Sequence, residues 1–402
     1  GTTTLLSKLT VAGGACITGV ITASNFVKAD GSSLGGGFSA DDDLNLFASN
    51  TCSGCNLDGS SGCFNLFLGS CAGKNVTSGA SNVFLGDYAG SCMCNGSDNI
   101  AIGSQALLGS GTVSNNSGAV NIVIGKEAGK NMTSGGCNTI VGCKSAFGIT
   151  TGANNTIFGK AAGRCITTTN YNAYFGSDAG KRMRGAYNIA LGAKSMGGSS
   201  TASNNTGGCN IAIGKETGES ITSGTGNVLL GVNAGCDLTT GGCNIGIGYH
   251  AMQDGTVTGA NNIALGKLSL EQLTSGTDNI AIGQCAMETG TVTGTHNIAI
   301  GCKAAKGTTS AEANIFIGRG AGINDTITGS NNVVLGAYAA TNITSGGCNI
   351  ILGKSAATNL TTGGKNIAIG SYNFNLPSAS DNCQLAIGMG SKYWITGNSD
   401  FN

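Results

Sequence analysis

The chain has 402 residues, of which 71 are Gly and one is Pro. The scarcity of Pro and the lack of a three-residue Gly period exclude collagen, and the balance of 20 basic against 20 acidic residues argues against a nucleic-acid partner. Apolar residues make up 40% of the chain, too many for ordinary disorder, yet no apolar run is long enough for membrane insertion.

An internal repeat dominates the sequence. Its unit is an Asn, three apolar or small residues and a Gly, and it returns every 17 or 18 residues with few exceptions. A degenerate copy begins at Asn45, and Gln384 replaces the Asn in the last copy. A helix-turn-helix repeat needs about 34 residues, so we expect each unit to form one coil of a parallel β-solenoid, or β-roll. The repeat Asn residues are Asn65, Asn82, Asn99, Asn121, Asn138, Asn155, Asn172, Asn188, Asn210, Asn227, Asn244, Asn262, Asn279, Asn297, Asn314, Asn332, Asn349 and Asn366.

Each coil is expected to follow one pattern, with positions counted from its Asn. Apolar residues at +1 and +3 alternate as on one face of a β-strand, and the Gly at +4 suits a turn with positive φ. An apolar residue followed by Thr, about eleven positions after the Asn, predicts a second short strand. About 19 coils stacked 4.8 Å apart would form a rod roughly 90 Å long. The Asn side chains are expected to form a hydrogen-bonded ladder.

The residues at position +2 lie on the opposite strand face, and none of them is charged. A strand with two apolar faces is buried on both. One face fills the interior of the coil, and the other needs a partner because a 17-residue coil has no second layer. An exposed apolar stripe would aggregate. The sequence therefore predicts that copies of the chain pack side by side around a rod axis.

Two coils are longer than the rest, because 22 residues separate Asn99 from Asn121 and Asn188 from Asn210. The extra residues do not fit inside a regular stack, so we expect two protruding polar loops, roughly 24 Å apart along the rod. Loops on rigid scaffolds commonly carry binding, and tolerated insertion without a role is the alternative. The candidate receptor contacts are Ser114, Asn115, Asn116, Ser117, Ser203, Asn204, Asn205 and Thr206.

Signals for catalysis or metal binding are weak. His250 and His296 are the only histidines, and no carboxylate recurs beside them. The Gly-Lys pairs of the turns lack the earlier Gly of a phosphate-binding loop. Cys52 and Cys55 could begin a zinc site, but no second pair has matching spacing. We therefore expect no enzyme activity, no cofactor and no metal. Most of the 17 Cys are interpreted as small apolar fillers, with bridges between coils or chains as the alternative.

The repeat resembles two kinds of fibrous protein. The phrase Asn-Ile-Ala-Ile-Gly-x-x-Ala at 99–106, 279–286 and 297–304 resembles the head repeat of YadA-type trimeric autotransporter adhesins, which form parallel β-rolls with three chains side by side. The 17-residue unit, the phrase Gly-Cys-Asn at 136–138 and 242–244 and the scattered Cys more closely resemble structural or tail-fibre repeat proteins of marine cyanobacterial phages. Phrases at 9–13 and 21–31 resemble the β-rich shafts of such fibres, and 393–399 resembles their linker phrase.

The resemblance implies an all-β, fibrous homotrimer in three parts: a shaft or connector at 1–40, a β-roll domain at 41–376, and a last degenerate coil with exit linker at 377–402. It implies a rigid spacer and host-facing attachment element of a viral tail fibre, located outside the cell on the virion. The expected partners are copies of the chain, other virion tail proteins and a host surface glycan. A bacterial trimeric adhesin head is one alternative. An ice-binding solenoid, suggested by the Thr column, is the other.

Overall fold

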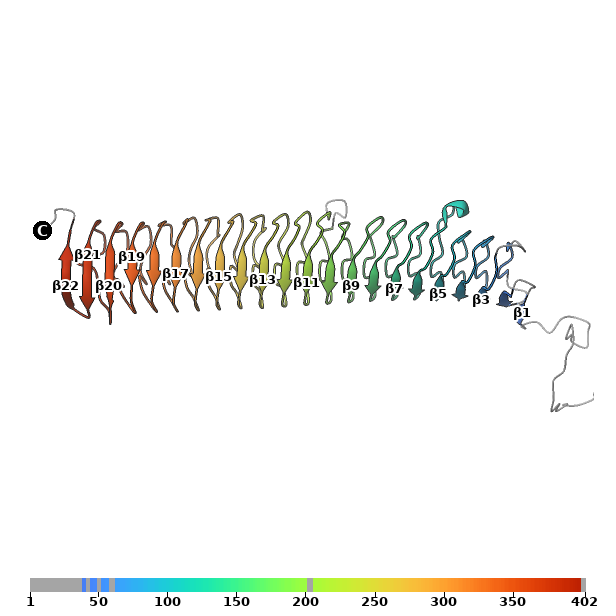
Figure 1. Ribbon diagram of the computed structural model, residues 1–402, viewed down its shortest axis with the longest axis horizontal. Helices are drawn as coiled ribbons and strands as arrows, with labels where there is room; N and C mark the ends of the chain where they lie inside the picture. Colours follow the sequence, from blue (N-terminus) through green and yellow to red (C-terminus); the bar gives the residue numbers. More distant parts are fainter. Residues whose placement is uncertain (1–37, 41–43, 49–51, 58–61, 201–204, 399–402) are drawn as a thin grey trace, which may run out of the picture.

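The computed structural model describes residues 38–40, 44–48, 52–57, 62–200 and 205–398. These residues form a long rod made of one β-solenoid, as Figure 1 shows. The helix in the described part of the chain is a single 3-10 turn, η1 (Val113–Asn115). The all-β solenoid of about 19 turns predicted from the sequence is therefore confirmed. Most of the expected shaft or connector segment, residues 1–37, lies outside the described residues.

Each regular coil contributes one three-residue strand to a single continuous sheet. From β2 to β21, every strand pairs in parallel with the strand of the next coil, and equivalent repeat positions face each other. The strands are β1 (Phe38–Ala40), β2 (Leu46–Ala48), β3 (Leu66–Leu68), β4 (Val83–Leu85), β5 (Ile100–Ile102), β6 (Ile122–Ile124), β7 (Thr139–Val141), β8 (Thr156–Phe158), β9 (Ala173–Phe175), β10 (Ile189–Leu191), β11 (Ile211–Ile213), β12 (Val228–Leu230), β13 (Ile245–Ile247), β14 (Ile263–Leu265), β15 (Ile280–Ile282), β16 (Ile298–Ile300), β17 (Ile315–Ile317), β18 (Val333–Leu335), β19 (Ile350–Leu352), β20 (Ile367–Ser371), β21 (Leu385–Met389) and β22 (Lys392–Gly397).

The repeat Asn residues form the predicted ladder, which runs unbroken from Asn45 to Gln384. A typical member is Asn279. Its backbone N–H and its Nδ2 donate to Oδ1 of Asn262 at 3.0 and 3.2 Å, and its Nδ2 also donates to the Gly294 carbonyl at 2.8 Å. Its own Oδ1 accepts from the backbone N–H of Asn297 at 3.0 Å. A buried amide with each partner supplied by a neighbouring coil avoids the penalty of unpaired polar groups, and it fixes the register of each coil on the next.

The interior is a narrow column of apolar side chains. The residues at +2 are fully buried, whereas those at +1 and +3 are half-buried or exposed, as in β15, where Ala281 is buried between Ile280 and Ile282. The small Ala at +7 and the apolar residue near +11 close the column from the turn side, as Ala128 and Met132 do. Position +2 therefore supplies the interior, and the face formed by +1 and +3 points outward.

The predicted second strand is wrong for most coils. The apolar-Thr segment forms bends, with isolated parallel bridges at Leu238–Val257, Leu273–Val292 and Thr308–Ile327. In a typical coil, the backbone N–H groups of Thr133 and Gly135 both donate to the same carbonyl, that of Thr150. A chain that turns within two residues cannot extend the ladder to strand length. Figure 1 accordingly shows a row of strands on one side of the rod and turns on the other.

Antiparallel strands cover both ends of the described stack. β1 pairs with β2, and β22 pairs with β21 through a register shift between Ile387 and Gly388. Residues 392–397, which the sequence suggested as part of an exit linker, therefore belong to the sheet. The ring of Tyr393 on β22 meets that of Phe374 edge-on at 5.3 Å. Such end strands occupy the free edge of a sheet that would otherwise pair with another chain.

Candidate attachment sites

The first long coil carries a loop at residues 110–115, which includes η1. The loop takes the place of the apolar residue that a regular coil has near +11, such as Met132. Asn116 closes the base of the loop. Its Nδ2 donates to the carbonyls of Cys92 at 2.8 Å and Ser110 at 2.9 Å, and its Oδ1 accepts from the Ser110 backbone N–H at 3.1 Å. Leu107 is fully buried in this coil and supplies the apolar volume that the loop residues do not.

The second long coil repeats this arrangement. Asn205 Nδ2 donates to the carbonyls of Arg182 at 3.3 Å and Ser199 at 3.2 Å, and its Oδ1 accepts from the Ser199 backbone N–H at 3.2 Å. Met196 is buried in the position that corresponds to Leu107. Residues 201–204, which include Ser203 and Asn204, lie outside the described residues.

The structure separates the candidate contact residues into two groups. Asn116 and Asn205 are buried anchors, so neither side chain is available to a receptor. Ser114, Asn115, Ser117 and Thr206 are exposed. The loop of the first long coil lies on the side of the rod opposite the strands in Figure 1. The anchoring role had a sequence signal, because the second Asn of each phrase follows a Ser by six residues in both coils.

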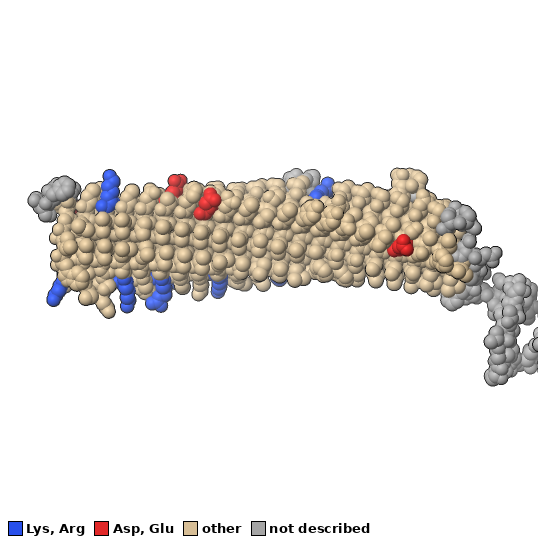
Figure 2. All heavy atoms as spheres, viewed as in Figure 1, with Lys and Arg blue, Asp and Glu red and all other residues tan. Residues whose placement is uncertain are grey.

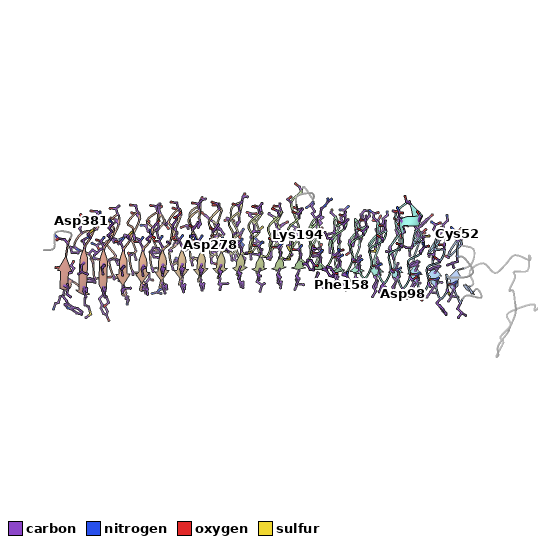
Figure 3. All side chains as sticks on the ribbon, turned by 45° about the horizontal axis from the view of Figure 1, so that its top comes forward. Cys52, Asp98, Phe158, Lys194, Asp278 and Asp381 are labelled. Atoms are coloured by element: carbon purple, nitrogen blue, oxygen red, sulfur yellow. The ribbon has the colours of Figure 1, made fainter. Side chains whose placement is uncertain are left out.

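A small charged hollow lies beside the second loop. It has a volume of about 160 Å³ and is lined by Asp178, Lys181, Arg182, Lys194, Gly197, Gly198 and Glu219. Lys181 Nζ pairs with Asp178 Oδ1 at 2.8 Å, and Lys194 Nζ pairs with Glu216 Oε1 at 3.0 Å. Figure 3 labels Lys194 on the coils near this loop. Because each of these lysines already has an acidic partner, the hollow offers a mixed polar surface rather than a site for one charged ligand.

An acidic row, which the sequence analysis missed, crosses five consecutive coils. It consists of Glu219, Asp237, Asp254, Glu271 and Glu288. Partial burial raises the pKa of Glu219, Asp237 and Glu271 above the ordinary value, and nearby carboxylates in the row add to each shift. The row lies nine or ten positions after the repeat Asn, so a search that allowed both offsets would have found it.

Replacing Glu271 by Gln should raise the melting temperature at neutral pH. A carboxyl with a raised pKa in the folded state destabilises the fold when ionised, and this cost disappears as the pH falls toward the ordinary value of 4.5. The wild-type protein should therefore become more stable as the pH falls from neutral, and Glu271→Gln should reduce that gain. Thermal unfolding across this range measures both effects.

Glu127→Gln is the matched control for this test. A hydrogen bond from Lys130 lowers the pKa of Glu127 below its ordinary value, so its ionised form favours the fold at neutral pH. The control variant should be no more stable than the wild type. A Glu271→Gln variant that melts at or below the wild-type temperature at neutral pH would contradict the repulsion argument.

The two histidines considered for metal binding or catalysis are not brought together, whereas the side chains of Cys52 and Cys55 are in hydrogen-bond contact. His296 Nε2 lies 3.8 Å from Asp278 Oδ2, and the His250 ring stacks on Tyr249 at 3.8 Å, in different coils. Within the described ranges, no group of three or more His, Cys, Asp or Glu side chains is arranged to hold a metal ion.

The interpretation of most Cys as apolar fillers is wrong. Of the sixteen Cys in the described part of the chain, Cys285 is buried and the rest are exposed or half-buried. Burial raises the pKa of the Cys285 thiol to about 11. The side chains at +2, +7 and about +11 fill the thin interior of this fold. Most Cys stand at other positions of the repeat, where the chain turns.

No model of a known protein family matches the chain, and no curated protein matches it. Across the residues that the structure describes, no helix has the length and apolar character needed to cross a membrane.

Proposed function

We propose that the chain is a segment of a homotrimeric fibre, in which it acts as a rigid spacer and host-facing attachment element of a viral tail fibre or similar virion appendage. One observation carries this proposal. The outward face of the sheet is a continuous apolar stripe, formed by the residues at +1 and +3, which an isolated chain leaves accessible to water. We call this surface the central stripe.

The central stripe has the composition of an interface. Its +1 and +3 positions hold Ile, Val, Leu and Phe with a few Thr and Ala, and none is charged. Several of its side chains are more than a third exposed, including Ile189 at 41%, Leu191 at 45% and Ile350 at 42%. Figure 3 shows side chains projecting from the strand row along the rod, with Phe158 labelled among them.

The size of the stripe suits association with further copies. A strand about 10 Å wide, repeated over a length of about 90 Å, presents roughly 900 Å² per chain. A stable protein interface buries about 800 Å² per partner. A second copy of the same rod has the same period of about 4.8 Å, so its side chains can interdigitate at every level. The number three comes from the resemblance to trimeric β-roll fibres.

The rod is suited to a mechanical role. Successive coils are joined by the sheet, by the Asn ladder and by Thr hydroxyls such as Thr344 Oγ1, which donates to the Thr361 carbonyl at 3.2 Å. Because the donors of this Thr column are engaged within the rod, they favour a structural role over an ice-binding face. The same geometry would serve the head of a bacterial trimeric adhesin, which is the second candidate.

The experiment that tests the attachment role removes both loops. Ser110–Asn115 and Ser199–Asn204 are each replaced by one Ile, and Asn116 and Asn205 by Thr, which restores two 17-residue coils. The buried Leu107 and Met196 should be tolerated, because the regular coil of Asn262 accommodates Leu270 and Leu273 together. We expect the trimmed protein to remain a trimer and to lose binding to host cells and to their immobilised surface polysaccharides.

The control keeps both loops and carries Gly111→Ala, a change into open space. This variant should bind as the wild type does. Undiminished binding by a trimmed protein of native mass would place the receptor contact elsewhere and remove the loops from the proposal.

A further inference from the structure

We infer that the chain carries thiols placed to form disulfide bonds between copies of itself; this inference rests on the side-by-side assembly proposed above. The residues immediately before the repeat Asn include Cys137, Cys209, Cys243, Cys348 and Cys383, and all five are exposed. Their φ angles lie between 55° and 59°. A left-handed backbone conformation is unfavourable for residues other than Gly, and Asn and Asp tolerate it better than Cys does. Neither burial nor backbone preference therefore accounts for Cys at this corner.

The two rims of the central stripe differ in charge. The rim before the Asn, which we call the cysteine rim, carries the five thiols and large exposed side chains such as Phe64 at 61%, Tyr171 at 51% and Tyr187 at 59%. The opposite rim, at position +5, carries six cations and one acid. Its cations are Lys126, Lys160, Lys215, Lys267, Arg319 and Lys354. Figure 2 shows Lys and Arg side chains along the lower edge of the rod.

This difference indicates which rim lies near the axis of the assembly. Bringing rows of like charge together is unfavourable, so the cationic rim should remain in solvent. The cysteine rim carries only three charged residues, of mixed sign: Asp98, Asp278 and Lys365. Its aromatic side chains extend the apolar surface of the central stripe, and the rings of Tyr171 and Tyr187 stack there with their centroids 5.0 Å apart. We therefore place the cysteine rim toward the neighbouring copies.

The register excludes pairing of these thiols within one chain. Cys209 and Cys243 are two coils apart, and so are Cys348 and Cys383, with a Gly or a Lys in the coil between. Two coils separate the Cα atoms by roughly 9.6 Å, whereas a disulfide needs them within about 7 Å. If two thiols of this column pair, they must therefore come from different chains.

The coil level also selects the partner. The coils of Cys209, Cys243, Cys348 and Cys383 contain no second Cys. In parallel copies held in register, the thiol at the same level is therefore the same-numbered residue of a neighbouring chain. In a trimer, one pair forms at each level and one thiol remains, so bridges at two levels can join all three chains.

The bond forms by thiol-disulfide exchange with a low-molecular-weight disulfide. One thiolate attacks a sulfur of this oxidant and releases a small thiolate, which takes up the proton. The thiolate of the neighbouring chain then attacks the mixed disulfide and releases the second small thiolate. Two protein thiols are oxidised to one disulfide, and one small disulfide is reduced to two thiols.

The test treats the native protein with oxidised glutathione and compares its mass under native and denaturing, non-reducing conditions. We expect covalent dimers and trimers that disappear on reduction, and peptide mapping should show links between same-numbered Cys of the cysteine rim. A variant with all five Cys replaced by Ser should keep the native mass and lose the covalent species. Cys143→Ser, an exposed thiol on the opposite rim, is the matched control and should cross-link normally.

Two failures have separate meanings. If the native multimer forms no covalent dimers or trimers, or if these persist in the five-Ser variant, the disulfide inference is wrong. The proposed assembly is unaffected by that result. A native monomer would overturn the assembly and this inference together.

Discussion

Gly283→Val should lower the melting temperature sharply. Gly283 follows β15 with φ +131°, a conformation that L side chains rarely adopt. The strain costs about 1–3 kcal/mol in each chain. A Cβ there would also lie 2.7 Å from the backbone C and O of Gly301 in the next coil. That contact cannot be relieved by a side-chain rotation, so the two coils must separate. Calorimetric unfolding measures the loss.

Gly111→Val is the matched control for this substitution. A Cβ added at Gly111 would meet no other atom within 4 Å, because this residue lies in the loop of the first long coil, outside the regular stack. The same change of side chain should leave the melting temperature nearly unchanged. If Gly283→Val were as stable as Gly111→Val, the turn at +4 would not require Gly. The recurrence of Gly at +4 would then need a reason other than its φ angle and the close approach of the next coil.

Ile282→Asp combined with Ile300→Asp should abolish association while leaving the coil folded. Both side chains occupy position +3 in adjacent coils of the central stripe and are only partly buried in the single chain. In an assembly they would bury two unpaired carboxylates, at a cost of several kcal/mol each. We expect a soluble monomer with the wild-type circular dichroism spectrum, measured by sedimentation and spectroscopy together.

Two further variants separate assembly from folding. Ala281→Asp places the charge inside the coil, where Ala281 is fully buried, and should unfold the neighbouring coils. Lys303→Asp changes the charge outside the stripe and should leave both mass and spectrum unchanged. A double Asp variant that keeps the native mass of the wild type would show that the central stripe is not the interface.

The sequence predicted the features that recur at a fixed distance from the Asn. The ladder followed because an amide carries both donor and acceptor and returns once per coil, as between Asn262 and Asn279. The turn at Gly283 followed because Gly is the residue that adopts such a φ readily. The pattern also gave two apolar strand faces, although it left open which one pointed inward.

The remaining features depend on contacts that a periodic pattern does not contain. The sequence analysis placed Asn116 among the exposed loop residues. Its side chain is instead held by hydrogen bonds to the carbonyls of Cys92 in the adjacent coil and Ser110 at the base of the loop, which the repeat pattern does not show. The Cys were misjudged because Cys is usually buried, whereas the corner conformation of Cys137 directs its side chain outward. The prediction of a second strand was wrong because the apolar-Thr segment bends. In this bend two backbone N–H groups donate to the same carbonyl, so no ladder can extend.

The native mass of the wild-type protein tests the central claim most directly. Sedimentation equilibrium at micromolar concentration should give three times the 39.5 kDa chain mass, with the exposed apolar stripe buried between the copies. A soluble monomer of 39.5 kDa under these conditions would contradict the account, because a rod with this stripe would then be stable alone in water.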